Sequence, residues 1–504
     1  MLLKSLPTLP KHRTDLVTRR MCATAHLDPR LAREVLADYA EDGMEALGPP
    51  VGINLIALVR HSRLVESRVH SQDRVLAWLL TALLALVTLA VAQVADRRPI
   101  VASLALGAVL LILVAAFAVV YRALWASWSI VLALSTQDDS ALTLAPPVAA
   151  EVEQHLASFK RLNMVVYHHS VEKVNPFVGS GWRISESVWN PLNIGRPAKD
   201  ANGAALVPLP FDAADLHQHV AKQISKATGL ESLTARNRLY VRGFFVSHIP
   251  DALPDPTKRP AAVIPSDWVK AGAARPTKGM ETYLCLRVIG EGGHVVVSMH
   301  LRAQLHHPTL TWEVNSYVLP PLGDRFGLPQ RLLAGPVRLR LRAAHDALRQ
   351  TRPLLFGSPG RLLGRASTRA RTARALEKQR REIRKGYATF DFGATNSLRE
   401  RAASWEKMGF AERRDSATFV KLLTQAVLVS TRDFLTAHHI DTTDLDDQQQ
   451  QIIQQQTTIF NGSIGNAVIG GTGNTQNNQQ GPVAPPGGGS SSGQPSAGGS
   501  PAAP

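Results

Sequence analysis

The sequence predicts an α+β protein that is anchored by a transmembrane helical hairpin and ends in a helical C-terminal region. Three observations predict this class. Two long apolar runs, 75–95 and 100–121, contain no charged residue. Residues 148–330 mix helical periodicity with β-branched runs joined by turn residues, and residues 331–446 are helical in pattern and strongly basic.

The two apolar runs predict a membrane hairpin. Each run has about 21 residues, which at about 1.5 Å per residue crosses a hydrocarbon core about 30 Å thick. The four residues between them, 96–99 (Asp-Arg-Arg-Pro), leave room only for a tight reversal. We therefore expect two spans, an external tip at 96–99, and a location in the cell membrane.

Positive charge predicts the orientation of the hairpin. Five arginines flank its outer ends and two lie at its tip: Arg60, Arg63, Arg68, Arg74 and Arg122 against Arg97 and Arg98. Because cytoplasmic flanks carry the excess of arginine and lysine, both termini are expected in the cytoplasm. The first run starts too late in the chain for a cleaved signal peptide. The only two cysteines, Cys22 and Cys285, offer no disulfide framework, which agrees with a reducing compartment.

Residues 1–74 are expected to form a cytoplasmic helical lead. A helix is predicted over Arg30–Leu47, with Asp28 as its N-cap and Pro29 at its first position. Residues 48–50 (Gly-Pro-Pro) end this helix, and a second amphipathic helix is predicted over Ile53–Val69.

Residues 148–330 are expected to form the main cytoplasmic domain. Two helices are predicted, at 149–162 and 211–227. The predicted strands are 163–168, a run from the Asn175–Gly181 turn to Trp189, 238–246, 282–289, 294–305 and 310–319. Glycine-rich residues 290–293 join two of these strands as a hairpin. Such an arrangement predicts an antiparallel sheet with helices.

Residues 331–446 are predicted as a basic helical region. Residues 331–385 contain 16 Lys and Arg against three acidic residues, out of a net charge of +16 for the whole chain. We expect a break at 353–364, a charged helix at 365–387 and a final helix at 415–438 with one apolar face. Anionic lipid headgroups are the expected ligand, since a cationic segment held near a bilayer meets them first. The residues proposed for this contact are Arg365, Arg369, Arg371, Arg374, Arg380, Arg381, Arg384 and Lys385. An acidic protein partner and a solvated helix face are the alternatives, and the near absence of aromatic residues disfavours nucleic acid.

The end of the chain changes composition. Residues 447–475 are rich in Gln, Asn and Gly and β-prone, and residues 476–504 are expected to be disordered. Residues 461–470 predict either a β-edge that pairs with another copy of the chain or a disordered adhesive segment.

No motif in the sequence identifies a reaction. The triplet Gly179-Ser180-Gly181 is too short for a nucleophile elbow, and Asp391-Phe392-Gly393 lacks the other kinase motifs. No histidine pair comes with a cysteine or a close carboxylate at ligand spacing, so no metal ligand, cofactor or catalytic residue is predicted. The turn residues Pro176, Phe177, Gly179, Ser180 and Gly181 are predicted as either a ligand-binding or a structural turn.

Four stretches together resemble a family of uncharacterised two-span membrane proteins from high-GC Gram-positive (actinobacterial) bacteria. They are 175–181 (NPFVGSG), 390–400 (FDFGATNSLRE), 440–445 (IDTTDL) and 458–470 (TIFNGSIGNAVIG). Phe392 departs from the pattern, where tyrosine is expected. The resemblance implies the two-span architecture and implies that the first two motifs are important to the protein. It implies no reaction and no catalytic residue.

The expected function is that of a membrane-anchored, non-enzymatic scaffold or sensor with a cytoplasmic domain that binds a partner or ligand. The expected partners are the lipid bilayer, an unknown protein and another copy of the chain. Four aspartates are expected to pair with the basic region, within or between chains: Asp441, Asp444, Asp446 and Asp447. The alternative is a membrane-bound enzyme of unknown reaction with a pocket near the Asn175–Gly181 turn.

Overall fold

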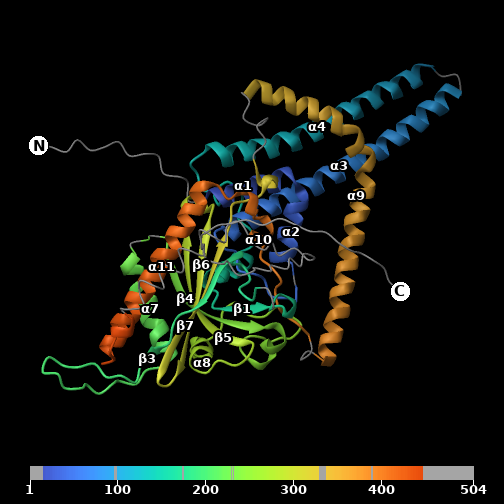
Figure 1. Ribbon diagram of the computed structural model, residues 1–504. Coiled ribbons are helices and arrows are strands. Elements are labelled where there is room, and N and C mark those ends of the chain that lie inside the picture. The colour runs from blue at the N-terminus through green and yellow to red at the C-terminus, as the bar shows by residue number, and fades with distance from the viewer. Residues whose placement is uncertain are drawn as a thin grey trace, which may run out of the picture. The chain divides into compact units, whose positions relative to one another are not determined.

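The computed structural model describes residues 15–41, 43–95, 99–172, 175–228, 230, 232–327, 336–386 and 390–445 (Figure 1). Its first helices are α1 (Leu16–Leu27) and α2 (Pro29–Tyr39). The predicted cap is present, because the Asp28 carboxylate accepts the N–H of Arg30 at 3.0 Å and Pro29 opens the helix. Helix α1 was not predicted, and α2 ends at Tyr39, earlier than expected.

The hairpin consists of α3 (Leu55–Ala95) and α4 (Pro99–Thr136). The predicted helix 53–69 and the first apolar run form one continuous helix, because neither glycine nor proline occurs between residues 55 and 95. Helix α4 likewise continues beyond its apolar run. Residues 96–98 of the predicted tip lie outside the described residues.

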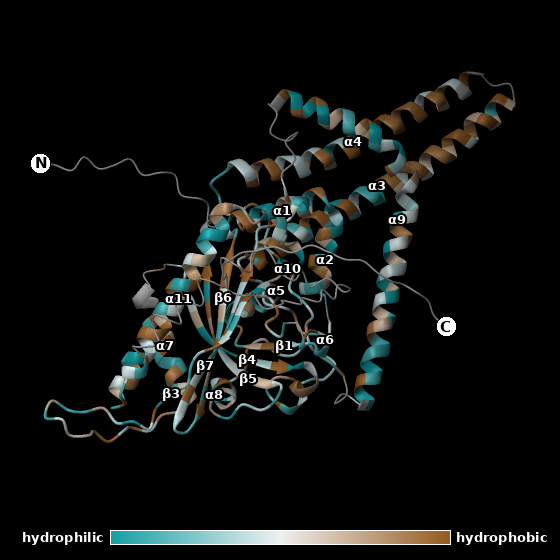
Figure 2. Ribbon diagram, in the orientation of Figure 1, coloured by the Kyte–Doolittle hydropathy of each residue, from teal (hydrophilic) through white to brown (hydrophobic). Residues whose placement is uncertain are grey.

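Both hairpin helices are long and apolar enough to cross a membrane. Their apolar runs are brown in Figure 2, and large side chains on them are exposed. Examples are Val91 at 65%, Leu104 at 70% and Leu111 at 71% exposure. Apolar side chains that are exposed over such a length fit contact with lipid better than contact with water.

A seven-stranded mixed sheet forms the centre of the following domain. Its strand order is β1-β4-β5-β6-β7-β2, with β3 also paired to β7. The strands are β1 (Met164–Tyr167), β2 (Trp182–Val188), β3 (Leu192–Asn193), β4 (Thr234–Arg242), β5 (Met280–Ile289), β6 (Val296–His306) and β7 (Thr309–Leu319). The pair β1–β4 is parallel and the other named pairs are antiparallel. The predicted α+β class is therefore confirmed, with one parallel pair added.

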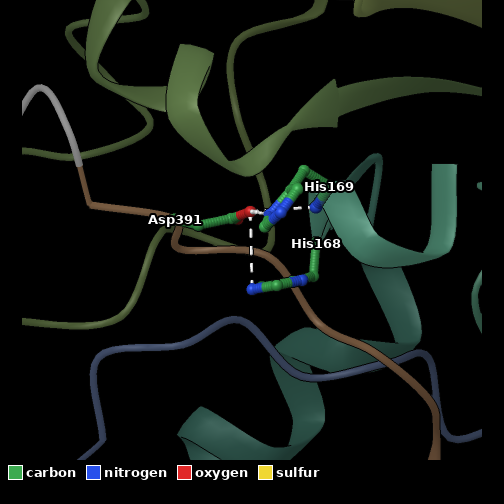
Figure 3. A group of neighbouring side chains, drawn as sticks. All are labelled: His168, His169 and Asp391. Carbon is green, nitrogen blue, oxygen red and sulfur yellow. Dashed lines mark hydrogen bonds and ion pairs between the residues drawn. The ribbon is translucent and has the colours of Figure 1, made fainter.

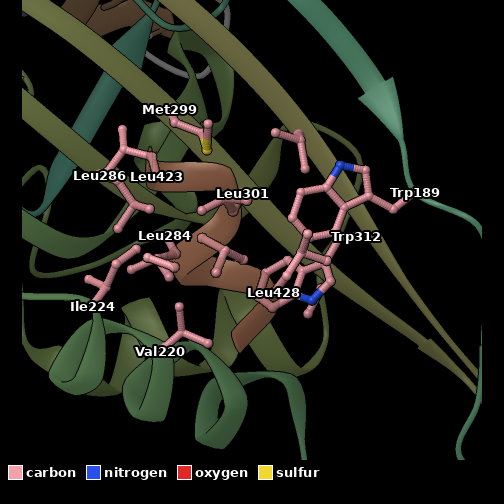
Figure 4. Close-up of a cluster of buried hydrophobic side chains, with 14 of the residues drawn as sticks. Trp189, Val220, Ile224, Leu284, Leu286, Met299, Leu301, Trp312, Leu423 and Leu428 are labelled. Atoms are coloured by element: carbon pink, nitrogen blue, oxygen red, sulfur yellow. The ribbon is translucent and has the colours of Figure 1, made fainter. Parts of the chain in front are cut away.

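Helices α7 (Ala213–Thr228) and α11 (Phe410–Ala437) pack against the sheet, and Figure 4 shows the side chains between them. Alternate residues of the strands point to this side, such as Leu284 and Leu286 of β5. They meet Val220 of α7 and Leu423 of α11, all fully buried. The apolar face predicted on the final helix thus finds its partner in the sheet.

Shorter elements complete the domain. They are α5 (Ala150–Ser158), η1 (Phe159–Arg161), α6 (His169–Glu172), η2 (Gly243–His248), α8 (Ser266–Ala274), η3 (Glu291–Gly293), η4 (Asp324–Phe326), α10 (Leu398–Ala402) and η7 (Trp405–Lys407).

Helix α9 (Pro336–Gly386) runs through the segment where a break was predicted, so that prediction is wrong. The helix contains Pro353 and Pro359, and Figure 1 shows it bent into two arms, as internal prolines cause. Proline 359 cannot donate to the carbonyl of Leu355, and the Ser358 hydroxyl donates to that carbonyl instead at 2.7 Å. Side-chain donors and packing therefore keep the helix continuous.

Helix α9 contacts the hairpin at one place and the sheet domain at another. Ala347 and Leu355 are buried with Leu76 and Leu80 of α3. Ile383, near the other end of α9, is buried with side chains of β1 and β4. The segments predicted at 447–475 and 476–504 lie outside the described residues.

Candidate functional site

The Asn175–Gly181 turn packs on sheet side chains that point away from α7 and α11. Phe177, 3% exposed, stacks on His300 of β6 with ring centroids 4.2 Å apart. Its edge contacts are with Tyr240 and Tyr283, at 5.0 and 4.9 Å. Phe177 therefore fills the centre of an aromatic cluster on this face.

Local hydrogen bonds close the turn. The Asn175 side chain accepts the N–H of Phe177 at 2.9 Å and donates to the carbonyl of Gly181 at 3.1 Å. Gly181 has φ of +88°, and a Cβ there would lie 2.4 Å from the carbonyl oxygen of Val318. Only glycine fits this position. Pro176 is half-buried at the start of the turn.

Glu400 connects the turn to the second motif, Phe390–Glu400. One oxygen of its carboxylate accepts the N–H groups of Gly179 and Gly181 at 2.8 and 2.9 Å, and the other accepts the N–H of Ser397 at 2.8 Å. The Ser397 hydroxyl accepts the N–H of Glu400 in return, which completes a capping box at α10. Desolvation raises the pKa of Glu400, and the three backbone donors oppose that rise. Two motifs more than 200 residues apart thus meet at one carboxylate.

The beginning of the second motif lies along β1. The N–H of Ala394 donates to the carbonyl of Val166 at 2.9 Å, and the N–H of His168 donates to the carbonyl of Ala394 at 3.0 Å. Phe392 is 1% exposed. The stretch therefore acts as a short additional parallel bridge at the edge of the sheet.

Ser180 is part of a buried polar chain. Its hydroxyl lies 2.8 Å from Nε2 of His300, whose Nδ1 lies 3.1 Å from the Cys285 sulfur and 3.2 Å from the Tyr240 hydroxyl. Burial lowers the pKa of His300, with Arg287 adding to the effect, and burial raises the pKa values of Tyr240 and Cys285. These four hydrogen-bonded side chains are therefore uncharged near pH 7. Ser180 is 2% exposed and His300 is fully buried, so a substrate has no access to the serine hydroxyl in this conformation.

A second polar cluster consists of His168, His169 and Asp391, which Figure 3 shows converging from two segments. One Asp391 oxygen accepts from the backbone N–H of His169 at 2.9 Å and from its Nδ1 at 2.8 Å, and Nε2 of His168 lies 3.5 Å away. The other oxygen accepts the N–H of Gly393 at 2.9 Å. Gly243 leaves space for this carboxylate, because a Cβ there would lie 1.7 Å from it.

This cluster has two chemical capacities. Its three ligand atoms lie within 4.8 Å of one another, and two imidazoles with a carboxylate are a ligand set for divalent transition metals. Alternatively, Asp391 holds Nδ1 of His169 as a donor, which leaves Nε2 of this half-exposed histidine able to accept a proton. The pattern of the sequence does not indicate this cluster, because Asp391 lies 222 residues beyond His169 and only the fold brings the two together.

The residues proposed for lipid contact lie along α9. Arg365 is paired with Asp73 of α3, and Arg369 lies 3.2 Å from Glu66 of the same helix. Arg380 is half-buried, and the remaining residues of the set are exposed: Arg371, Arg374, Arg381, Arg384 and Lys385. Among the described residues, Asp441 and Asp444 pair with Arg196, at 3.0 and 3.7 Å, and not with the basic region. Asp446 and Asp447 lie outside the described residues.

A cavity of about 270 Å³ adjoins the second motif. It is lined by residues 43–48, by Leu376 and Gln379 of α9, and by residues 394–396. Its wall carries charges of both signs, from Arg259 and Arg401 and from Asp38 and Glu45, and Arg401 pairs with Asp38.

Comparison with known proteins places the chain in a family. A family model described as the AbeC-like domain matches residues 182–475, from β2 through the Phe390–Glu400 motif and beyond. The match starts directly after the Asn175–Gly181 turn and leaves the hairpin outside. No curated protein and no solved structure matches the chain. Because the family model covers more than half of the 504 residues, the protein belongs to the AbeC-like domain family.

Proposed function

We propose that this protein is a membrane-anchored, non-enzymatic scaffold or sensor with both termini in the cytoplasm. Its cytoplasmic domain binds a protein partner or a small ligand. The observation that carries this proposal is the double attachment of α9, which contacts both the foot of the hairpin and the sheet domain.

The attachment to the hairpin is ionic. Asp73, 2% exposed, precedes the first apolar run and accepts hydrogen bonds from Arg361 at 2.9 and 2.7 Å and from Arg365. The attachment to the sheet domain is apolar and involves Ile383, also 2% exposed. A helix that is fixed at both sites couples the position of the domain to the foot of the anchor.

The cavity of about 270 Å³ supports the sensing part of the proposal. It lies where α9 and the Phe390–Glu400 motif meet, so an occupant would contact both. Its volume lies just below the range of about 300–1,000 Å³ that is typical for small-molecule sites. The wall holds Arg259 and Arg401 beside Asp38 and Glu45, and Arg401 already pairs with Asp38. A small polar occupant that both donates and accepts hydrogen bonds therefore fits this wall.

The partner is tested by affinity purification of the detergent-solubilised full chain from its own cells, with mass spectrometry. Thr395→Trp fills the cavity, and Ser367→Trp, on an exposed face of α9, is the matched control. We expect a defined partner that is lost with Thr395→Trp and kept with Ser367→Trp. A chain that ends at Asp447 tests docking through the tail. Failure of every form of the chain to retain any protein would contradict the scaffold role.

One observation favours the alternative of an enzyme, namely the 2.8 Å contact between Ser180 and His300. A fluorophosphonate probe labels serines that a histidine activates. Because Ser180 is buried, we expect no labelling of the wild-type chain. Labelling that disappears in Ser180→Ala would establish a reactive serine and replace the scaffold role with the enzymatic one.

A further inference from the structure

A cavity of about 610 Å³ lies at the foot of the hairpin, among α1, α2, α3, α4 and α9. Its wall on α3 extends to Asp73, and its wall on α4 runs from Val120 to Trp128. These walls adjoin the apolar runs 75–95 and 100–121 at the ends remote from the tip. The depth is that of the headgroup region if the runs span a bilayer, and Trp128 suits that depth.

Arginine dominates the charge of the cavity wall. Six arginines face three aspartates, and one of those aspartates, Asp73, is already shared by two of the arginines. Another, Asp28, pairs with Arg325, which is not part of the wall. Over the described part of the chain, the remaining four arginines of the wall have no carboxylate within 4.0 Å. They are Arg30, Arg33, Arg68 and Arg349.

Two buried polar atoms on residues of this wall also need a partner. Nη1 of Arg365 and Nδ1 of His26 are both buried, and neither has a hydrogen-bond partner among the described residues. Buried polar atoms are normally satisfied. Because both atoms have almost no accessible surface, an anionic oxygen in the cavity would satisfy them only after their side chains turn toward it.

Apolar side chains also line the wall. Val69, Leu124 and Leu354 come from three different helices. A free inorganic anion would gain nothing from contact with these apolar side chains, whereas the glycerol and upper acyl carbons of a phospholipid would pack on them. The combination of arginines, apolar side chains and interfacial depth matches one class of ligand.

We infer that this cavity binds the phosphate headgroup of an anionic glycerophospholipid, held chiefly by Arg33, Arg68 and Arg349. The inference rests on the membrane anchoring proposed above. It differs from lipid contact by the exposed surface of α9, because the three arginines that would hold the headgroup belong to α2, to α3 and to the part of α9 before Pro353. A bound lipid would also touch Arg361 and Arg365, which attach α9 to the hairpin.

The test uses the full chain in micelles of an uncharged detergent. Dioleoylphosphatidylglycerol, dioleoylphosphatidylcholine and inorganic phosphate are titrated separately, and bound lipid is counted by native mass spectrometry beside the melting temperature. We expect phosphatidylglycerol to be retained and to raise the melting temperature. Phosphatidylcholine and inorganic phosphate should neither be retained nor raise the melting temperature.

Variants locate the site. Arg33→Gln with Arg68→Gln should weaken phosphatidylglycerol binding about 30-fold, since each arginine near anionic lipid contributes about 1 kcal/mol. Arg371→Gln with Arg374→Gln removes the same charge from the exposed part of α9 and should leave binding unchanged. If the first pair does not fold, Arg30→Gln with Arg349→Gln, both exposed, takes its place.

Three results would overturn the inference: equal retention of the two lipids, equal protection by inorganic phosphate, or equal loss in the cavity and control variants. Alkaline carbonate extraction distinguishes this failure from failure of the anchor. A chain released from membranes by carbonate refutes the anchoring, whereas a retained chain without lipid preference refutes the cavity site alone.

Discussion

At the scale of single residues, Glu400 has the widest effect on the site, since its carboxylate holds the N–H groups of Gly179, Gly181 and Ser397. Removing its charge leaves these donors with a weaker partner, and an amide cannot accept from all of them without turning its own donors toward them. The two motifs would then separate more easily.

We predict that Glu400→Gln lowers the free energy of unfolding by about 2 kcal/mol. Thermal unfolding of the full chain in detergent measures the loss. Glu406→Gln, at an exposed position, is the control and should change little. Unchanged stability in Glu400→Gln would show that the carboxylate is not needed to join the motifs.

His217 of α7 makes the domain sensitive to acid. Burial lowers the pKa of His217 to about 4, from 6.5, and its Nε2 accepts the N–H of Ala303 at 3.0 Å. The unfolded chain therefore takes up a proton near pH 6.5 while the folded chain does not. The contribution of neutral His217 to the free energy of unfolding is fully present above pH 6.5. It is lost as the pH falls towards 4, by about 3 kcal/mol in total.

We predict that His217→Gln reduces the loss of stability between pH 7 and pH 4.5, because glutamine keeps the acceptor and takes up no proton. Unfolding at both pH values measures the difference. His307→Gln, at an exposed position, should keep the wild-type dependence. The same dependence in His217→Gln would assign the acid sensitivity to other groups.

At the scale of elements, the sequence predicts those helices and strands that are determined by interactions between residues close together in the chain. The apolar runs, the Asp28 cap and strands β4 to β7 are predicted because charge, capping and side-chain alternation are local properties. The continuity of α9 is not local, since it depends on Ser358 and on burial of Leu355 against the hairpin. The cluster of His169 with Asp391 and the contact of Ser180 with His300 join distant segments, so sequence pattern alone could not reveal them.

The attachment of α9 to α3 yields the prediction at this scale. Asp73→Asn leaves Arg361 and Arg365 without their anion, a change that costs about 3 kcal/mol for a buried pair. We expect trypsin to cleave α9 at least about tenfold faster in this variant. Glu66→Gln is the matched control, because its partner Arg369 is 64% exposed and such pairs contribute at most about 1 kcal/mol. Equal cleavage rates in the two variants would place the attachment elsewhere.

At the scale of the whole molecule, the hairpin decides which side of the membrane the sheet domain occupies. In the sequence, five arginines flank the outer ends of the two apolar runs and two lie between the runs, so the domain is expected in the cytoplasm. The lipid site proposed at the foot of the hairpin depends on the same orientation, because the cytoplasmic leaflet carries anionic lipid.

We therefore predict opposite labelling of two introduced cysteines by a membrane-impermeant maleimide. Arg97→Cys, at the tip, should react in intact cells, and Ala204→Cys, on an exposed loop of the domain, should react only after permeabilisation. The native Cys22 and Cys285 are buried and should give little background. Labelling of Ala204→Cys in intact cells would reverse the orientation. In that orientation the arginine-lined cavity would lie at the external face of the membrane, and any lipid bound in it would come from the external leaflet.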